Sequence, residues 1–210
     1  MLKKKICVLV SGGGTNLQAL IDAQNRGEIP NGEISCVFSS KAGVYALNRA
    51  EKNGIKTVVL PRADYADNQS YSRDLLKILQ EEQADLIVYA GFMVILDRCV
   101  CEAFPNRMMN VHPALIPSFC GKGFYGLHVH EAALKSGVKV TGATVHFVTD
   151  VCDGGPIILQ KAVAVQTGDT PETLQRRVME EAEWEILPRA VSLFCDERIF
   201  IENGNAYIKE

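Results

Sequence analysis

The stretch MMNVHPALIP, residues 108–117, places a carboxamide and an imidazole two residues apart at the end of an apolar run. Successive side chains of a β-strand alternate between its faces, so Asn110 and His112 point the same way. Pro113 removes a backbone donor and favours an extended conformation at His112, which ends the strand there. A carboxamide can donate to a developing oxyanion, and an imidazole can do the same or move a proton. The spacing therefore predicts a catalytic pair.

A carboxylate is the third group that this pair needs, because a nearby anion stabilises an imidazole that carries positive charge. The stretch TDVCDGGP, residues 149–156, supplies Asp150 and Asp153. Asp153 is the better candidate, since the two glycines after it let the chain fold tightly. The alternative is that His112 is a structural histidine. The presence of Asn110, a glycine loop and an Asp-Gly-Gly turn in one chain favours catalysis.

The glycine loop is VSGGGTN, residues 10–16, which lies between an apolar run and a helical pattern that begins near Leu17. Glycines let backbone N–H groups approach a ligand, and a helix N-terminus favours an anion. The dinucleotide fingerprint is incomplete, because Leu17 stands at its third glycine position. We therefore expect a cradle for one phosphate, with Thr15 and Asn16 as additional donors. The alternative is a turn that needs glycine only for its backbone angles.

Short β-rich runs carry these groups and alternate with helical patterns. The runs lie at 6–10, 34–38, 56–60, 85–90 and 108–112, and the helical patterns near 16–26, 43–53, 69–83 and 94–104. This alternation predicts an open, mostly parallel, Rossmann-like α/β sheet with helices on both faces, in which ligands bind beyond the carboxyl ends of the strands.

Beyond residue 138 the pattern changes, because two long β-like runs are separated by a glycine-rich turn, which predicts mixed or antiparallel strands. Thr144 and His146 share a strand face there and either line the site or pack in the core. A long helix is expected from about 171, with Thr170 as its N-cap. The tail predicts a hairpin around Asn203 and Gly204.

Composition limits the classes of function. With 210 residues, 47% hydrophobic, we expect one domain over 1–210. The net charge of −3 and the lack of a basic stripe argue against nucleic acid, and the first apolar run is too short for a signal peptide or membrane span, so we expect a cytoplasmic protein. The seven cysteines include no CxxC pair, and His128 and His130 lack a third ligand, so no metal is expected. The sequence does not define the oligomeric state.

The blocks VSGGGTNLQAL, AGFMVIL, NVHPALIPSF and GATVHFVTDVCDGGPIILQ, with a glutamate in the last long helix, resemble the folate-dependent phosphoribosylglycinamide formyltransferase family from end to end. The resemblance implies small-molecule substrates, with formyl transfer from 10-formyltetrahydrofolate to the amine of glycinamide ribonucleotide in purine biosynthesis. It implies catalytic roles for Asn110, His112 and Asp153. It places contacts to the ribonucleotide at Gly14, Thr15, Asn16 and Glu183. It places folate contacts at Met93, Val94, Ile95, Leu96, Asn110, Val148, Thr149, Asp150 and Asp153.

The sequence departs from the family at three places. Val94 stands where many members have arginine, Asn68 where members often carry a basic residue, and the segment 118–127 belongs to a longer version of its loop. The expected mechanism has Asn110 and a protonated His112 holding a tetrahedral oxyanion, with Asp153 keeping the imidazole cationic.

Three alternatives stay open. Methionyl-tRNA formyltransferase normally has a further C-terminal domain and formyltetrahydrofolate hydrolase an extra N-terminal one, so the length of the chain disfavours both. A non-catalytic nucleotide-binding module would keep the glycine loop but would not need the Asn, His and Asp.

Overall fold

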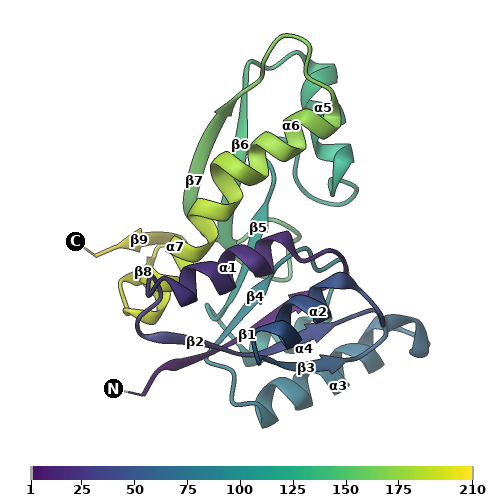
Figure 1. The fold of residues 1–210 in the computed structure, drawn as a ribbon, viewed down its shortest axis with the longest axis vertical. Coiled ribbons are helices and arrows are strands. Elements are labelled where there is room, and N and C mark those ends of the chain that lie inside the picture. Colours follow the sequence, from purple (N-terminus) through teal and green to yellow (C-terminus); the bar gives the residue numbers. More distant parts are fainter. Residues whose placement is uncertain (1, 210) are drawn as a thin grey trace.

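Figure 1 shows the computed structural model, which describes residues 2–209. Seven strands form one sheet in the order β3-β2-β1-β4-β5-β6-β7. The strands β1 to β5 pair in parallel, whereas β6 is antiparallel to β5, and β7 to β6. This arrangement confirms the predicted mostly parallel sheet with antiparallel strands in its C-terminal part.

The strands of this sheet are β1 (Lys4–Val10), β2 (Gly32–Ser39), β3 (Lys56–Val59), β4 (Leu86–Tyr89), β5 (Met108–His112), β6 (Val140–Phe147) and β7 (Ile157–Ala164). The helices are α1 (Thr15–Asn25), α2 (Tyr45–Lys52), α3 (Asn68–Glu81), α4 (Arg98–Ala103), α5 (Leu127–Ser136), α6 (Pro171–Val178) and α7 (Trp184–Cys195). A short 3-10 helix, η1 (Arg62–Asp64), follows β3, and a π-helical turn, η2 (Met179–Glu183), joins α6 to α7.

Two predictions of helices were wrong or incomplete. The pattern over 94–104 becomes helical only at Arg98, because residues 91–97 form an irregular loop. The helix α5 was not predicted, although Gly126 and Gly137 stand at its two ends with positive φ angles of 55° and 72°. Glycines at both ends of an apolar stretch were the available signal for this helix.

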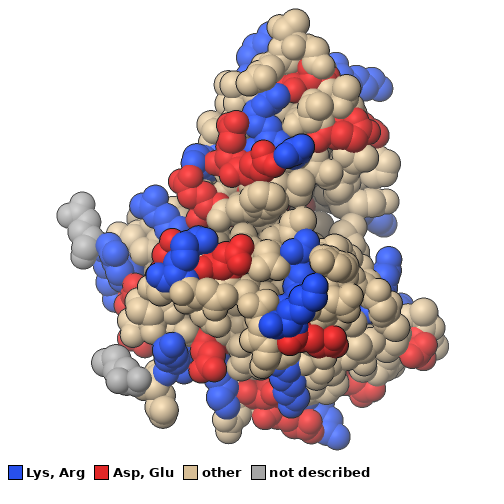
Figure 2. Space-filling model, in the orientation of Figure 1, with Lys and Arg blue, Asp and Glu red and all other residues tan. Residues whose placement is uncertain are grey.

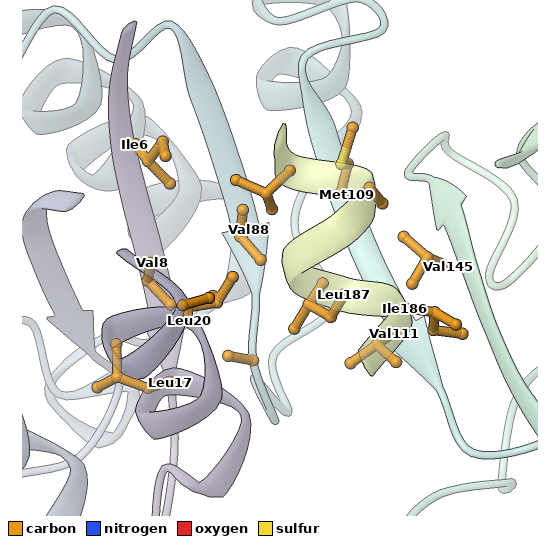
Figure 3. Close-up of a cluster of buried hydrophobic side chains, with 14 of the residues drawn as sticks. Ile6, Val8, Leu17, Leu20, Val88, Met109, Val111, Val145, Ile186 and Leu187 are labelled. Carbon is orange, nitrogen blue, oxygen red and sulfur yellow. The ribbon is translucent and has the colours of Figure 1, made fainter. Parts of the chain in front are cut away.

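Helices cover both faces of the sheet, as predicted. A first core packs Ile6, Val8 and Val88 of the strands against Leu17 and Leu20 of α1, with Ile186 and Leu187 of α7 beside Met109, Val111 and Val145 (Figure 3). A second core on the opposite face packs strand residues against α3 and α4, including Leu9, Ile87 and Met108. The sheet is therefore buried on both sides at its centre, as a parallel sheet requires.

The alternation of side chains along β5 places Asn110 and His112 on the face of the second core. Met109 and Val111 belong to the first core, so Asn110 and His112 point to the opposite face, on the side of Met108. On that face, β5 continues past the second core with polar side chains instead of apolar ones. The strand ends where parallel-sheet ligands are expected.

The C-terminal elements match the sequence prediction closely. The Thr170 side chain accepts a hydrogen bond from Thr173 N, and Pro171 occupies the first turn of α6. The strands β8 (Ile199–Glu202) and β9 (Asn205–Ile208) form the expected hairpin, with Asn203 and Gly204 at φ angles of 50° and 78°.

The outer surface mixes charges of both signs. In Figure 2, lysines and arginines are interspersed with acidic residues over the visible face. One ion pair, Arg176–Glu180 at 2.8 Å, joins α6 to η2. Within residues 2–209, no helix combines the length and the apolar character needed to cross a membrane.

Candidate active site

The strand β6 brings a second histidine to the predicted pair. In the antiparallel register, His146 lies opposite Asn110 and Thr144 opposite His112. Asn110 Nδ2 lies 3.3 Å from His146 Nε2, and His146 Nδ1 lies 2.8 Å from the carbonyl oxygen of Phe147. Because a carbonyl only accepts, Nδ1 carries a hydrogen, and Nε2 is the ring atom that faces Asn110. His146 therefore orients the carboxamide.

Asp153 lies between the two imidazoles. Its Oδ2 atom is 3.6 Å from His112 Nδ1, and its Oδ1 atom is 3.6 Å from His146 Nε2. These distances are too long for good hydrogen bonds, and the contacts are ion pairs when the rings are protonated. A Cβ on Gly155 would lie 1.8 Å from the carbonyl oxygen of Phe147, so this turn closes against the end of β6 only with glycine there. The structure thus brings Asn110, His112 and Asp153 together.

The pKa values of the site oppose part of the sequence-based mechanism. Burial alone would raise the pKa of Asp153, but the His146 side chain, the Gly121 N–H and the charge of His112 lower it to about 2. Burial lowers the pKa of His112, and the carbonyl of Phe119 and the charge of Asp153 only partly oppose this. Loss of hydration therefore acts against a proton on His112, whereas the Asp153 carboxylate and the Phe119 carbonyl act in favour of it.

The segment 118–127 lies directly on these groups. His112 Nε2 donates to the carbonyl oxygen of Phe119 at 2.8 Å, and the backbone N–H of Gly121 donates to Asp153 Oδ2 at 2.8 Å. Phe119 and Gly121 both have positive φ angles, 50° and 87°. The sequence marked this segment as longer than in relatives but could not place it, because its contacts are with residues distant in the chain. A ligand that takes a hydrogen bond from His112 Nε2 must replace the Phe119 carbonyl.

The glycine loop combines both interpretations made from the sequence. Gly14 needs to be glycine for structural reasons, since its φ is 73° and a Cβ would lie 2.7 Å from the Cβ of Ala46. Gly12 and Gly13 have no atom within 4 Å of a Cβ position, so the space on that side is open, while their carbonyls accept from Ala46 N and Arg49 Nε. Thr15 begins α1 and is exposed. Within residues 2–209 the N–H groups of Gly12 and Gly13 donate to no protein group, so the loop offers them to an anion at a helix N-terminus.

Sequence analysis missed the arginine beside this loop. Arg49 of α2 donates from Nε to the carbonyl oxygen of Gly13 at 2.9 Å and from Nη1 to Gln18 at 3.0 Å. A cavity of about 240 Å³ adjoins it, lined by Thr15, Gln18, Ala19, Asp22, Arg26, Arg49 and Trp184. The sequence shows only a basic residue in the helical pattern after the second strand. The packing of α2 against the glycine loop shows that this residue holds the Gly13 carbonyl.

Glu183 meets the other end of the glycine loop. Asn16 Nδ2 donates to Glu183 Oε2 at 2.6 Å, and the glutamate side chain is buried. Burial raises the pKa of Glu183 to about 7, although the hydrogen bond from Asn16 lowers it. The residue ends the π-helical turn η2, which adds a residue to the helical repeat and directs this carboxyl inward. A titratable acid thus lies beside the predicted phosphate cradle.

The predicted folate contacts Met93 to Leu96 lie in the loop between β4 and α4. Met93 and Ile95 are 51% and 62% exposed, which is unusual for large apolar side chains. Val94, at the position of the family's arginine, packs against the second core instead. Within residues 2–209, the backbone N–H and C=O groups of Val94, Ile95 and Leu96 make no hydrogen bond to the protein. They are free to bond a ligand.

The loop after β6 contributes the remaining predicted folate residues. Val148 N donates to the carbonyl oxygen of Met108 at 2.8 Å, so this residue is tied to β5. The Thr149 hydroxyl bonds the backbone of Val151, and Asp150 is exposed. The loop thus runs beside the carboxyl end of β5.

Three other polar residues have different positions. Thr144 donates to the carbonyl oxygen of Ala114 at 2.6 Å and accepts from Ile116 N at 3.1 Å, so it holds the chain after His112. His128 is exposed beside Glu131. His130 is fully buried with neither ring nitrogen hydrogen-bonded, and burial lowers its pKa to about 4. No group of three or more His, Cys, Asp or Glu side chains within residues 2–209 is arranged to hold a metal ion.

Comparison with known proteins gives the class of this fold and site. Residues 4–191 match the family model described as formyl transferase, and the chain belongs to this family. A phosphoribosylglycinamide formyltransferase from Escherichia coli is 39% identical over 203 residues, which cover 97% of this chain and 92% of that protein.

Solved structures agree with the sequence comparison. Glycinamide ribonucleotide transformylase 1 from Symbiobacterium toebii has a TM-score of 0.93 at 42% identity and covers 99% of this chain and 95% of its own. A formyltetrahydrofolate deformylase from Pseudomonas syringae has a TM-score of 0.88 at 26% identity, and this chain covers 66% of it. Similarity over nearly the full length of both proteins therefore favours the ribonucleotide formyltransferases within the family.

Proposed function

We propose that the protein transfers the formyl group of 10-formyltetrahydrofolate to the amine of glycinamide ribonucleotide. The products are formylglycinamide ribonucleotide and tetrahydrofolate, and the reaction belongs to de novo purine biosynthesis. The proposal treats residues 1–210 as a single formyltransferase domain that acts in the cytoplasm on small-molecule substrates, without nucleic acid, membrane or metal. It is supported by the family and by the similarity to ribonucleotide formyltransferases along nearly the whole chain.

The observation that carries the proposal is the placement of three groups at one strand end. Asn110 and His112 point from the same face of β5, and Asp153 lies 3.6 Å from the His112 ring. A carboxamide and an imidazole on one face can both donate to an oxygen that gains negative charge. A module that only binds nucleotides has no use for this arrangement.

In the proposed reaction, the amine lone pair attacks the formyl carbon and the formyl oxygen becomes an oxyanion. Asn110 Nδ2 and His112 Nε2 donate hydrogen bonds to it, after the carbonyl of Phe119 has left His112. An anion next to His112 raises its pKa, so the imidazole takes up charge when charge develops. The bond from carbon to the folate nitrogen then breaks. Asp153 organises water that carries the proton lost by the amine to this nitrogen.

The same proposal assigns the binding residues. The backbone at Gly14 and the side chains of Thr15 and Asn16 hold the phosphate, and Glu183 contacts the rest of the ribonucleotide. The free backbone groups of Val94, Ile95 and Leu96, within the loop 93–96, hold the folate together with the loop 148–153. Exposed Met93 and Ile95 offer apolar contacts to its rings.

One assay tests the reaction. The purified protein is mixed with glycinamide ribonucleotide and a formylated folate analogue, and the absorbance change of the deformylated product is followed. We expect turnover that requires both substrates. Loss of the formyl group at the same rate without ribonucleotide would indicate a hydrolase, and binding of ribonucleotide in isothermal titration without any turnover would indicate a binding module.

A further inference from the structure

The loop Gly91–Asp97 is held to the protein at two backbone positions by serine hydroxyls. Met93 N donates to Ser11 Oγ at 3.0 Å, and Asp97 N donates to Ser72 Oγ at 2.8 Å. Ser11 is 6% exposed and Ser72 is fully buried. The two hydroxyls come from the end of β1 and from α3, so each one joins the loop to a different rigid element.

Ser11 is itself fixed by a second buried serine. Its Oγ atom lies 2.7 Å from Ser40 Oγ, and Ser40 is 2% exposed. Ser40 follows β2, and its backbone N–H donates to the carbonyl oxygen of Val10 at 3.1 Å. A hydroxyl that can rotate is thereby oriented by its partner, which leaves a lone pair of Ser11 Oγ directed at Met93 N.

The two bonds bracket the part of the loop that has no internal bonds. Val94, Ile95 and Leu96 lie between the anchors, and their backbone groups make no hydrogen bond within residues 2–209. A backbone that must present such groups to a ligand binds more tightly when it is held in place beforehand, because less conformational freedom is lost on binding. The serines supply this constraint without using the ligand-facing groups.

Ser11 also belongs to the glycine loop, where it directly precedes Gly12. Ser11 therefore connects the glycine loop, which is open on one side at Gly12 and Gly13, to the segment 93–96. These are the regions assigned above to the ribonucleotide and to the folate, respectively. The binding residues assigned above do not include Ser11, Ser40 or Ser72.

We propose that Ser11, oriented by Ser40, and Ser72 are positioning residues that fix the loop Gly91–Asp97 for the formyl donor. The inference rests on the proposed function for the identity of the ligand. The anchoring of the loop itself rests only on the hydrogen bonds. Each hydroxyl acts on the donor through the backbone of Met93 or Asp97, not by touching it.

The test uses Ser11→Ala, Ser40→Ala and Ser72→Ala in the full chain, with Ser39→Ala as the matched control. Ser39 is 1% exposed and adjacent to Ser40, but its hydroxyl bonds only the backbone of Lys41. Loss of one buried neutral hydrogen bond corresponds to a change of about five-fold. We expect the KM for the formyl donor to rise by about this factor in the three variants, with kcat and the KM for ribonucleotide changed less than about two-fold.

Amide hydrogen exchange, measured residue by residue by NMR without ligands, gives a readout independent of activity. We expect the Met93 amide to exchange at least about five-fold faster in Ser11→Ala and Ser40→Ala. The Asp97 amide should do so in Ser72→Ala. Loss of one of these two hydrogen bonds should not change exchange at the other amide. Ser39→Ala should change neither amide. A general increase in exchange over the whole chain would instead report lost stability and would overturn the positioning role.

The two arms separate the two hypotheses. If the wild-type protein shows no formyl transfer, the proposed function fails, and amide exchange still decides whether the serines anchor the loop. If the wild-type protein is active and the three variants keep its donor KM, the inference fails and the proposed function stands. Equal effects on donor and ribonucleotide KM, or on the control variant, would also overturn it.

Discussion

Replacing Glu183 by glutamine is predicted to change how the stability of the protein depends on pH. Burial raises the pKa of this carboxyl from 4.5 to about 7, although the hydrogen bond from Asn16 lowers it. A carboxyl whose pKa is raised by folding favours the folded state below the pKa of the unfolded chain. That contribution is lost as the pH rises from 4.5 through about 7.

The magnitude follows from this pKa. One pKa unit corresponds to about 1.4 kcal/mol, so ionisation of Glu183 in the folded protein costs about 3 kcal/mol more than in the unfolded chain. Because some of this titration occurs below pH 5, about 2 kcal/mol of stability is lost between pH 5 and pH 8. Glutamine cannot ionise, yet it keeps an oxygen that accepts from Asn16 Nδ2.

The assay is urea unfolding of both proteins at pH 5, 6, 7 and 8 without substrates. We expect the glutamine variant to gain about 2 kcal/mol relative to wild type as the pH rises from 5 to 8. Other titrating groups, His130 among them, are shared by both proteins and cancel in the difference. Glu181→Gln is the control, because Glu181 is exposed in the same π-helical turn. A stability difference that stays constant with pH would refute the argument from burial.

Three further predictions concern the site and its surroundings. In His112→Ala and Asp153→Asn, turnover should fall on the order of 10² to 10³-fold in the formyl-transfer assay while ribonucleotide affinity in isothermal titration is kept; wild-type turnover in either variant would contradict their assignment. Gly13→Ala should unfold within about 0.5 kcal/mol of wild type, since a Cβ there meets no atom within 4 Å, yet bind ribonucleotide at least about ten-fold more weakly. Unchanged affinity would rule out a phosphate at this backbone. Burial lowers the pKa of His130 from 6.5 to about 4, so its contribution is present above pH 6.5 and lost as the pH falls through 4. In urea unfolding, the free energy of unfolding of His130→Leu should therefore fall by about 2 kcal/mol less than that of wild type when the pH is lowered from 7 to 4.5. Equal decreases in the two proteins would contradict the effect of His130 burial.

Local patterns predicted most of the fold. The five parallel strands, the Thr170 cap and the Asn203-Gly204 hairpin depend on neighbouring residues, and the structure contains all of them. The loop before α4 was mistaken for helix, because its apolar spacing is compatible with one. The local signal for the later start is Asp97, whose side chain accepts from Cys99 N and caps α4. The two hydrogen bonds that hold the preceding loop come from serines distant in the chain, and no local pattern reveals these.

The candidate site divides in the same way. Residue types and two-residue spacing placed Asn110 and His112 on one face, and the Asp-Gly-Gly turn marked Asp153. The role of His146 stayed open, because it depends on the register of β6 against β5. The sequence shows the acidic partner of His112 but not the burial that lowers the pKa of the ring, because burial depends on the packing around it.

The sequence by itself determined the order of strands and helices and the chemical groups at their ends, because periodicity and turn residues act over a few positions. Only the tertiary structure decided that Phe119 and Gly121 lie on His112 and Asp153, that a π-helical turn directs Glu183 toward Asn16, and that Ser11 holds Met93. Distances between remote residues, and the pKa shifts that burial causes, arise from the packing of the whole chain. They are therefore absent from any short stretch of it.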